Sequence, residues 1–308
     1  MILAAVLVLA LLAFGYWAVW FTCGRRPLPD LHDPQTMERP NWKPYKEHIL
    51  AGMEWLEKQE IRPLQVISYD GKALYARFVP CENARGTILL FHGYRSACVV
   101  DFSAALELYH SMGLNLLLCD QRSHGMSQGK FLTFGAKERY DVLSWVTYLS
   151  LMLGEDHPLI LDGMSMGATT VLLASELEFP GNVRGIIADC GFSCGADIAA
   201  SVAKSKYGLP PKLTAAFLDV FTRLYAGFSL KQSSAVEAVR HTDLPVMIIH
   251  GLADRLVPPA MSDTIYAAIP GRKVLLQVPG AGHGGSYTTD TPRCQKALRE
   301  YVDSLLME

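Results

Sequence analysis

A serine between two glycines is the first feature of this sequence that could do chemistry. Residues 163–167 read Gly-Met-Ser-Met-Gly, and they stand between an apolar run and a segment predicted to be helical. A tight turn from strand to helix leaves no room for side chains beside the serine, and it exposes the serine hydroxyl. The helix N-terminus also directs the amide of Met166 toward a developing oxyanion. The pattern predicts Ser165 as a nucleophile, and the alternative is a glycine-rich packing turn.

Two later apolar runs are followed by residues that could activate this serine. Asp254 follows Val246–Ile249, and His283 follows Lys273–Val278 in a glycine-rich loop. A histidine in such a loop can act as a general base on the serine, and a carboxylate can orient it. The chain order is serine, acid, histidine, unlike the orders of chymotrypsin and subtilisin. Asp189 is a second candidate for the acid, but Asp254 is favoured because its surrounding motif is complete.

The remaining histidines near strand ends have structural interpretations. His92 and His124 are expected to brace turns, and His250 is expected to be packed. The amide of Tyr94, just after the apolar run that ends at Phe91, is expected to be the second oxyanion donor. This chemistry needs no metal and no organic cofactor.

Short apolar runs alternate with helical segments from about residue 60 onward. A hairpin is expected around Asp70-Gly71, between Leu64–Ser68 and Ala73–Phe78. The later strands are predicted at Gly86–Phe91, Leu114–Cys119, Leu159–Leu161, Val183–Ala188, Val246–Ile249 and Lys273–Val278. Helical candidates lie near residues 100–112, 137–153, 166–177, 259–268 and 291–307. The alternation predicts an α/β domain over residues 60–308, with a mostly parallel, twisted sheet and helices on both faces. Ligands of such sheets bind at the carboxyl ends of the strands.

Residues 194–243 interrupt this alternation and are predicted to form a small helical cap. They carry an apolar stripe made of Ala215, Phe217, Leu218, Phe221, Leu224, Tyr225 and Phe228. The stripe has three interpretations: it lines an acyl pocket together with Met164 and Met166, it touches a membrane surface, or it packs the cap onto the body. Met164, Phe217 and Phe221 are our candidates for substrate binding.

The N-terminal segment is apolar enough to cross a membrane. Residues 2–21 contain no charge, and about 20 such residues in a helix span a bilayer core of about 30 Å. We expect residues 1–23 to be an uncleaved single-pass anchor and residues 24–59 a connector that becomes helical near Tyr45–Glu57. A cleaved signal peptide is the rival, but no basic residue precedes the apolar run. Arg25 and Arg26 follow it, so the positive-inside rule places the catalytic domain in the cytoplasm.

Composition narrows the class of protein further. The 308 residues carry a net charge of -2 and no long basic run, so nucleic acid is not an expected partner, and no protein partner is indicated. Seven irregularly spaced cysteines are expected to be reduced. Cys190 and Cys194 could form a redox or metal pair, but we expect them simply to pack beside a loop.

From about residue 60 to the C-terminus, the chain resembles the α/β-hydrolase superfamily. The matching pieces are His92-Gly93, Asp120-x-Arg122-x-His124-Gly125-x-Ser127, Gly163-x-Ser165-x-Gly167-Ala168-Thr169-Thr170, Asp189-Cys190-Gly191-Phe192-Ser193 and His250-Gly251-x-x-Asp254-x-x-Val257-Pro258. Within the superfamily, the chain is most similar to a bacterial membrane-anchored branch of serine hydrolases that is related to eukaryotic abhydrolase-domain proteins and is often described as lysophospholipase-like. The resemblance implies Ser165 as nucleophile, His283 as base and Asp254 as orienting acid. One departure is Ser123, where family members commonly carry glycine.

These observations predict a serine hydrolase that cleaves small or lipid-like carboxylic esters. The same residues would serve an amide or peptide hydrolase or an acyltransferase. A membrane-tethered binding module without catalysis is the alternative from a different class.

Overall fold

A sheet of eight strands forms the centre of the computed structural model, which describes residues 1–40 and 42–307. The strands are β1 (Arg62–Ile67), β2 (Ala73–Val79), β3 (Gly86–Phe91), β4 (Leu114–Asp120), β5 (Leu159–Met164), β6 (Val183–Asp189), β7 (Val246–Gly251) and β8 (Lys273–Val278). Their order across the sheet is β1-β2-β4-β3-β5-β6-β7-β8. Each predicted strand is present, and β3 and β8 have the predicted bounds.

The sheet is mostly parallel, as the sequence predicts. β2 runs antiparallel to both of its neighbours, whereas β4, β3, β5, β6, β7 and β8 are paired in parallel. The hairpin turns at Gly71, whose φ of 76° is open to glycine without strain. Every residue of β3 is buried, because helices cover both faces of the central strands.

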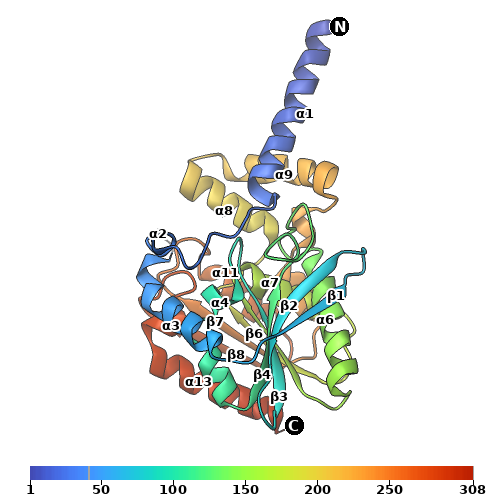
Figure 1. Cartoon of the computed structure of the whole chain (residues 1–308). Helices are drawn as coiled ribbons and strands as arrows, with labels where there is room; N and C mark the ends of the chain where they lie inside the picture. The colour runs from blue at the N-terminus through green and yellow to red at the C-terminus, as the bar shows by residue number, and fades with distance from the viewer. Residues whose placement is uncertain (41, 308) are drawn as a thin grey trace.

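Helices cover the two faces of the sheet in two separate layers (Figure 1). One layer is built from α3 (Lys46–Glu57), α4 (Cys98–Asp101), α5 (Leu106–Ser111) and α13 (Thr291–Leu306). The other is built from α6 (Glu138–Leu153), α7 (Met166–Ala174), α10 (Ala235–Ala238) and α11 (Ala260–Ala268). The remaining short elements are α2 (Pro34–Met37), η1 (Lys43–Tyr45), η2 (Leu230–Gln232), η3 (Val239–His241) and α12 (Ser286–Thr289). The helix predicted near residues 100–112 is two short helices, α4 and α5.

The segment predicted as a connector is packed into the body. Helix α3 has nearly the predicted bounds, but Ile49, Met53 and Leu56 on it are buried in the core beneath one face of the sheet, and so is Met37 of α2. The prediction of a connector over residues 24–59 therefore overlooks a layer of the fold. Its signal in the sequence is the apolar spacing of Ile49, Met53 and Leu56, which suits one face of a helix.

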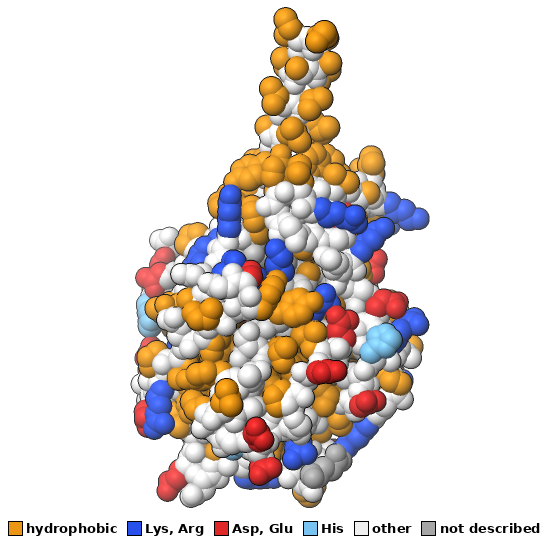
Figure 2. Space-filling model, turned by 90° about the vertical axis from the view of Figure 1, so that its right-hand side faces the viewer, with side chains coloured by type: hydrophobic (Ala, Val, Ile, Leu, Met, Phe, Trp, Pro, Cys, Tyr) orange, Lys and Arg blue, Asp and Glu red, His pale blue; other side chains and the backbone are white. Residues whose placement is uncertain are grey.

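Two helices form the cap above the carboxyl end of the sheet. They are α8 (Gly195–Tyr207) and α9 (Pro211–Ala226), and the long helix α1 (Ile2–Cys23) rises from them (Figure 1). α1 is the one helix in the described residues that is long and apolar enough to cross a membrane. Its first half stands clear of the body, and Figure 2 shows this half as an apolar column.

The second half of α1 packs against α9. The rings of Phe14 and Phe217 are 5.6 Å apart, and the Tyr225 hydroxyl donates a hydrogen bond to the carbonyl of Leu12. A Cβ added at Gly15 would lie 2.1 Å from the Phe221 ring, so the two helices touch closely at this glycine. The apolar stripe of α9 is thus covered largely by the N-terminal helix.

Candidate active site

Ser165 lies in a strained turn between β5 and α7. Its φ of 55° and ψ of -112° are unfavourable for a residue with a side chain. The turn is possible because its neighbours are glycines: a Cβ at Gly163 would lie 2.2 Å from the Gly167 carbonyl oxygen, and one at Gly167 would lie 1.8 Å from the Phe91 carbonyl oxygen. This is the strand-turn-helix geometry expected of the Gly-x-Ser-x-Gly pattern, and it leaves Ser165 half-buried at the sheet edge.

The structure brings the three predicted catalytic residues into one hydrogen-bonded chain. The His283 Nε2 atom lies 2.9 Å from Ser165 Oγ, and His283 Nδ1 lies 2.7 Å from Asp254 Oδ2. Because the carboxylate can only accept, Nδ1 carries a proton and Nε2 is free to accept the proton of the serine. The residues follow β5, β7 and β8, and the parallel strands bring these ends to one edge of the sheet.

Both oxygens of the Asp254 carboxylate have hydrogen-bond partners within the protein. Its Oδ1 accepts hydrogen bonds from the amides of Leu256 and Val257, and its Oδ2 also lies 3.3 Å from His250 Nε2. Burial alone would raise the pKa of Asp254, but the hydrogen bonds from His250 and His283 outweigh it and hold that pKa well below its usual range. Asp254 is therefore ionised, as a residue that orients a histidine must be.

His250 supports Asp254 from behind. It is completely buried between the Val257 carbonyl and the Ser262 hydroxyl, which agrees with the expected packed position. Burial alone would lower the pKa of His250, but the hydrogen bond to Asp254 outweighs it and raises that pKa. Its spacing of four residues from Asp254 is the signal that could have indicated this contact.

Asp189, the second candidate for the acid, has a different environment. It ends β6, and its Oδ1 accepts a hydrogen bond of 3.4 Å from Ser286. Burial, with a smaller contribution from the charge of Asp254, raises the pKa of Asp189 to about 6. Asp254 is the carboxylate that the structure places against the ring of His283.

Two backbone amides adjoin the serine and are free to bind an oxyanion. Within the part of the chain that the structure describes, the amides of Tyr94 and Met166 donate no hydrogen bond. Met166 is the first residue of α7, where helix amides lack internal partners. Gly93, next to Tyr94, packs against Ser165, since a Cβ there would lie 3.3 Å from that of the serine. These are the two amides that the sequence predicts as oxyanion donors.

Two side chains fix the loop that carries Tyr94, those of Asp101 and His124. Asp101 accepts hydrogen bonds of 2.6 Å from the Gly93 amide and from the Ser96 hydroxyl. His124 Nε2 accepts a hydrogen bond from the Arg95 amide. Sequence reasoning missed Asp101, whereas the expected bracing role of His124 agrees with this contact.

His92 and His124 form an edge-to-face pair beneath the same loop. Their ring centroids are 4.8 Å apart, and His92 Nε2 accepts a hydrogen bond from the Gln121 amide. Burial lowers the pKa of His92 to about 4 and the pKa of His124 to about 3. Both rings are therefore neutral acceptors near neutral pH, which suits braces of the backbone rather than bases.

Of the three substrate-binding candidates, only Met164 lies at this site. Met164 ends β5 beside Ser165, and its sulfur lies near Gly284 in the loop of His283. Phe217 and Phe221 do not line a pocket here, because their rings pack against α1 and against each other at 4.7 Å. The prediction for these two residues is wrong, and the reason is the helix of residues 2–23, which covers the stripe.

Tyr45 is a further residue near the site that sequence reasoning missed. It comes from the predicted connector, and a Cβ at Gly285 would lie 2.5 Å from its hydroxyl. The ring thus covers the glycine-rich loop that carries His283. Burial raises the pKa of Tyr45, so it remains a neutral hydroxyl.

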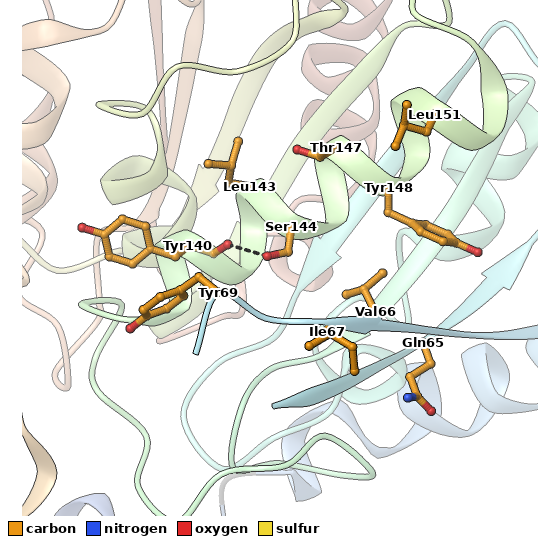
Figure 3. Close-up of a pocket in the computed structure, with 10 residues that line it drawn as sticks. All are labelled: Gln65, Val66, Ile67, Tyr69, Tyr140, Leu143, Ser144, Thr147, Tyr148 and Leu151. Atoms are coloured by element: carbon orange, nitrogen blue, oxygen red, sulfur yellow. Dashed lines mark hydrogen bonds between the residues drawn. The ribbon is translucent and has the colours of Figure 1, made fainter. Parts of the chain in front are cut away.

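A groove about 610 Å³ in volume lies elsewhere, between β1 and α6 (Figure 3). Figure 3 shows Ile67 of β1 on one side and the side chains of α6, such as Leu151, on the other, with the rings of Tyr69 and Tyr140 at one end. The groove follows the outermost strand of the sheet, four places away from β5. It is therefore separate from the edge that carries Ser165.

Cys190 lies beside the hydrogen-bonded residues. Its sulfur and ligand atoms of Asp254 and His283 fall within 4.8 Å of one another, a spacing that could suit a metal ion. Asp254 and His283 are already bonded to each other, and burial raises the pKa of the Cys190 thiol well above its usual value. The three residues are thus better suited to a proton relay than to a metal, and the absence of a metal requirement stays a prediction. All seven cysteines are free thiols.

Comparison with known proteins identifies the first part of the domain. A family model described as "Serine aminopeptidase, S33" matches residues 82–232, which include Ser165 and the cap but neither Asp254 nor His283. An uncharacterized protein of Bacillus subtilis (strain 168), YqkD, is 26% identical over 257 residues, which cover 83% of each chain.

Solved structures extend the likeness to 80–82% of this chain. The Pyrococcus furiosus esterase Pf2001 has a TM-score of 0.63 and 22% identity, over 80% of this chain and 93% of that one. Est1E of Butyrivibrio proteoclasticus, solved with ferulic acid bound, has a TM-score of 0.60 and 21% identity, over 80% of this chain and all of that one. Pyrococcus horikoshii acylaminoacyl peptidase has a TM-score of 0.60 and 14% identity, over 82% of this chain and 43% of that one. The chain therefore has the α/β-hydrolase fold.

Proposed function

We propose that this protein is a serine hydrolase that cleaves carboxylic esters through an acyl-enzyme intermediate. The observation that carries the proposal is the continuous hydrogen-bonded chain from Ser165 through His283 to Asp254, beside two free backbone amides. A nucleophile, a base, an orienting acid and an oxyanion site are the four components that acyl transfer requires.

In the proposed mechanism each group takes one step. His283 Nε2 takes the proton of Ser165 as the serine oxygen attacks the ester carbonyl, and Asp254 holds the resulting imidazolium in place. The amides of Tyr94 and Met166 bind the oxyanion, each contributing about 2.7–4 kcal/mol to the transition state. His283 then gives the proton to the leaving alcohol. Water attacks the acyl-enzyme by the same route and releases the acid.

Hydrolysis of amides is the second candidate. The description of the matching family model as a serine aminopeptidase and the fold likeness to an acylaminoacyl peptidase favour it. The fold likeness to the esterase Pf2001 favours esters, and Est1E, a second structure of similar fold, was solved with ferulic acid bound. The same residues serve both reactions, so the preference depends on the leaving group and on the shape of the acyl site.

We also propose that α1 is a retained membrane anchor and not a cleaved signal. Gly15, Ala18 and Val19 of α1 are buried against the cap, and removal of the helix would leave the rings of Phe217 and Phe221 uncovered. Because Arg25 and Arg26 follow the helix, we propose on the positive-inside rule that the domain is cytoplasmic. The guanidinium of Arg25 also donates to the carbonyls of Gly125 and Ser127, so its charge has a structural use as well.

The test is hydrolysis of p-nitrophenyl esters from C2 to C16 by the full chain in detergent micelles. Aminoacyl p-nitroanilides report on amide cleavage in parallel. We expect ester hydrolysis that Ser165→Ala abolishes, whereas Ser205→Ala, at an exposed serine of α8, retains it. Equal ester hydrolysis by Ser165→Ala would contradict the mechanism. Anilide cleavage without ester cleavage would establish the second candidate, and acyl transfer to added alcohols without hydrolysis would indicate a transferase.

A further inference from the structure

Helix α9 also has an exposed apolar stripe, which shares Leu224 with the stripe that faces α1. Leu213, Val220 and Leu224 are exposed to 70%, 61% and 58%, and their spacing of seven and four residues places them on one face of the helix. Phe221, which packs toward α1, flanks this face, and the opposite side of the helix carries the buried residues Ala215, Asp219 and Thr222. A soluble helix would present polar side chains where Leu213, Val220 and Leu224 lie.

The cap around this stripe is basic, although the whole chain carries a net charge of -2. Between Asp197 and Glu237, two exposed acids that bound the segment, the exposed charged residues are all cations: Lys204, Lys206, Lys212, Arg223 and Lys231. The one acid inside this segment, Asp219, is buried, accepts hydrogen bonds from Ser229 and Leu230, and is paired with Arg223. Figure 2 shows basic side chains at the shoulder of the molecule, just below the apolar column of α1.

The contact between α1 and α9 fixes how far the helix projects. Contacts with the cap begin at Leu12, and residues 1–11 are exposed. These eleven residues extend about 16 Å, which is half of a bilayer core of about 30 Å. A bilayer that encloses the apolar length of α1 must therefore reach down to α9 and its exposed stripe.

We propose that α9 is seated in the surface of a bilayer that contains anionic lipids. Leu213, Val220 and Leu224 lie at the boundary of the acyl chains, and the surrounding lysines contact the headgroups, as in an interfacial amphipathic helix. The inference rests on the proposed anchoring by α1 and is independent of hydrolase activity. The last turn of α1 also accepts hydrogen bonds from the side chains of Tyr94 and Arg95. Helix α1 therefore connects the proposed membrane surface directly to the loop whose Tyr94 amide is the proposed oxyanion donor.

The test measures the depth of single positions in the full chain. A bimane label is attached to Val220→Cys, to Leu7→Cys on the free half of α1, and to Leu151→Cys, which is exposed on α6. The proteins are reconstituted into vesicles of phosphatidylcholine and phosphatidylglycerol, and labelled wild type gives the background from native cysteines. Quenching by doxyl-labelled lipid is compared with quenching by iodide in the water.

We expect the labels at positions 220 and 7 to lose most of their fluorescence to the doxyl lipid, and the label at 151 to respond to iodide alone. Replacement of Lys204, Lys206 and Lys212 by glutamate should remove the lipid quenching at position 220 and preserve it at position 7. Iodide quenching at 220 with lipid quenching at 7 would overturn the proposal. So would a label at 220 that neither quencher reaches, which would indicate a second copy of the chain on the stripe, or a label at 7 that lipid does not reach. Loss of ester hydrolysis alone would bear only on the proposed function.

Discussion

At the carboxyl edge of the sheet, Ser165, His283 and Asp254 are joined by hydrogen bonds of 2.9 and 2.7 Å, whereas α1 and α9 are joined by aromatic rings more than 5 Å apart. The first contact is directional, and each of its residues lies in the turn or loop that follows a strand. The second is spread over many apolar atoms and has no fixed partner for any single ring. A small change should therefore abolish the function of the first region and only weaken the second.

The largest expected effect distinguishes the two buried acids at the sheet edge. Asp254→Asn should lower kcat for ester hydrolysis by about 10⁴-fold, because the amide no longer holds the correct tautomer of His283. Asp189→Asn, whose side chain contacts Ser286, should change kcat by less than about tenfold. The measurement is steady-state hydrolysis of a C4 ester. The reverse ranking of the two variants would assign the orienting role to Asp189.

Truncation of a side chain between α1 and α9 should lower the stability of the protein and leave its catalytic constants nearly unchanged. Phe221→Ala should destabilise the protein by about 3 kcal/mol, since the buried ring loses its contacts with α1. KM and kcat for a C4 ester should stay within about threefold of the wild type, as expected of small changes away from the site. Leu213→Ala, at an exposed position of α9, is the matched control and should change stability in detergent by less than about 0.5 kcal/mol.

Chemical unfolding in detergent and ester kinetics check both statements. A large increase in KM with unchanged stability would place Phe221 in the substrate pocket after all.

Acidification should lower the free energy of unfolding through His92 and His124, the two histidines beneath the loop that carries Tyr94. The pKa values of His92 and His124 fall from 6.5 in the unfolded chain to about 4 and about 3 in the fold, chiefly through burial. Between pH 6.5 and 4 the unfolded state binds more protons, so the free energy of unfolding falls with acidification by about 1.4 kcal/mol per pH unit for each histidine. Stability from these groups is fully present above pH 6.5.

A variant isolates this dependence. His124→Asn retains an acceptor for the Arg95 amide. Between pH 6.5 and 4, the free energy of unfolding of this variant should depend less steeply on pH, because one of the two histidine contributions is lost. His32→Asn, at an exposed position, should keep the slope of the wild type. Denaturant titrations at several pH values provide the comparison, and an unchanged slope in His124→Asn would show that this ring does not titrate as described.

The smallest effect concerns the serine that replaces a common glycine. Ser123 has a φ of 65°, in the left-handed region, and its buried hydroxyl has no hydrogen-bond partner among the described residues. Ser123→Gly should therefore raise the free energy of unfolding by about 1–2 kcal/mol and leave ester kinetics unchanged. Asn83→Gly, at an exposed position with a φ of 53°, should gain less, because asparagine tolerates this conformation. Equal gains in both variants would remove the buried hydroxyl from the explanation.

The sequence predicts the sheet edge well because its information is local. Ser165, Asp254 and His283 each follow an apolar run, and parallel strands bring their carboxyl ends together. The glycines at 163 and 167 predict that other backbone segments pass close to them, and the structure confirms this. The role of Asp101 could not be predicted, because it depends on contacts across a turn that no pattern marks. The contact of His250 with Asp254 was missed although its spacing of four residues could have indicated it.

The cap could not be placed in this way because its contacts are remote. Tyr225 bonds to Leu12, 213 residues away, and apolar spacing on α9 shows that a face is buried without showing against what. Phe217 and Phe221 were thus predicted to meet substrate and instead meet α1. The same holds for Tyr45, which a pattern places on a connector and the fold places over the loop of His283.

The central claim is that Ser165 is an activated nucleophile, and covalent labelling tests it most directly. The full chain in detergent micelles is treated with a fluorophosphonate, digested, and analysed by mass spectrometry for the modified peptide. The account predicts one adduct, on Ser165, that is lost in Ser165→Ala and strongly slowed in His283→Ala. An intact protein with no adduct, or an adduct that forms equally fast in Ser165→Ala, would contradict it.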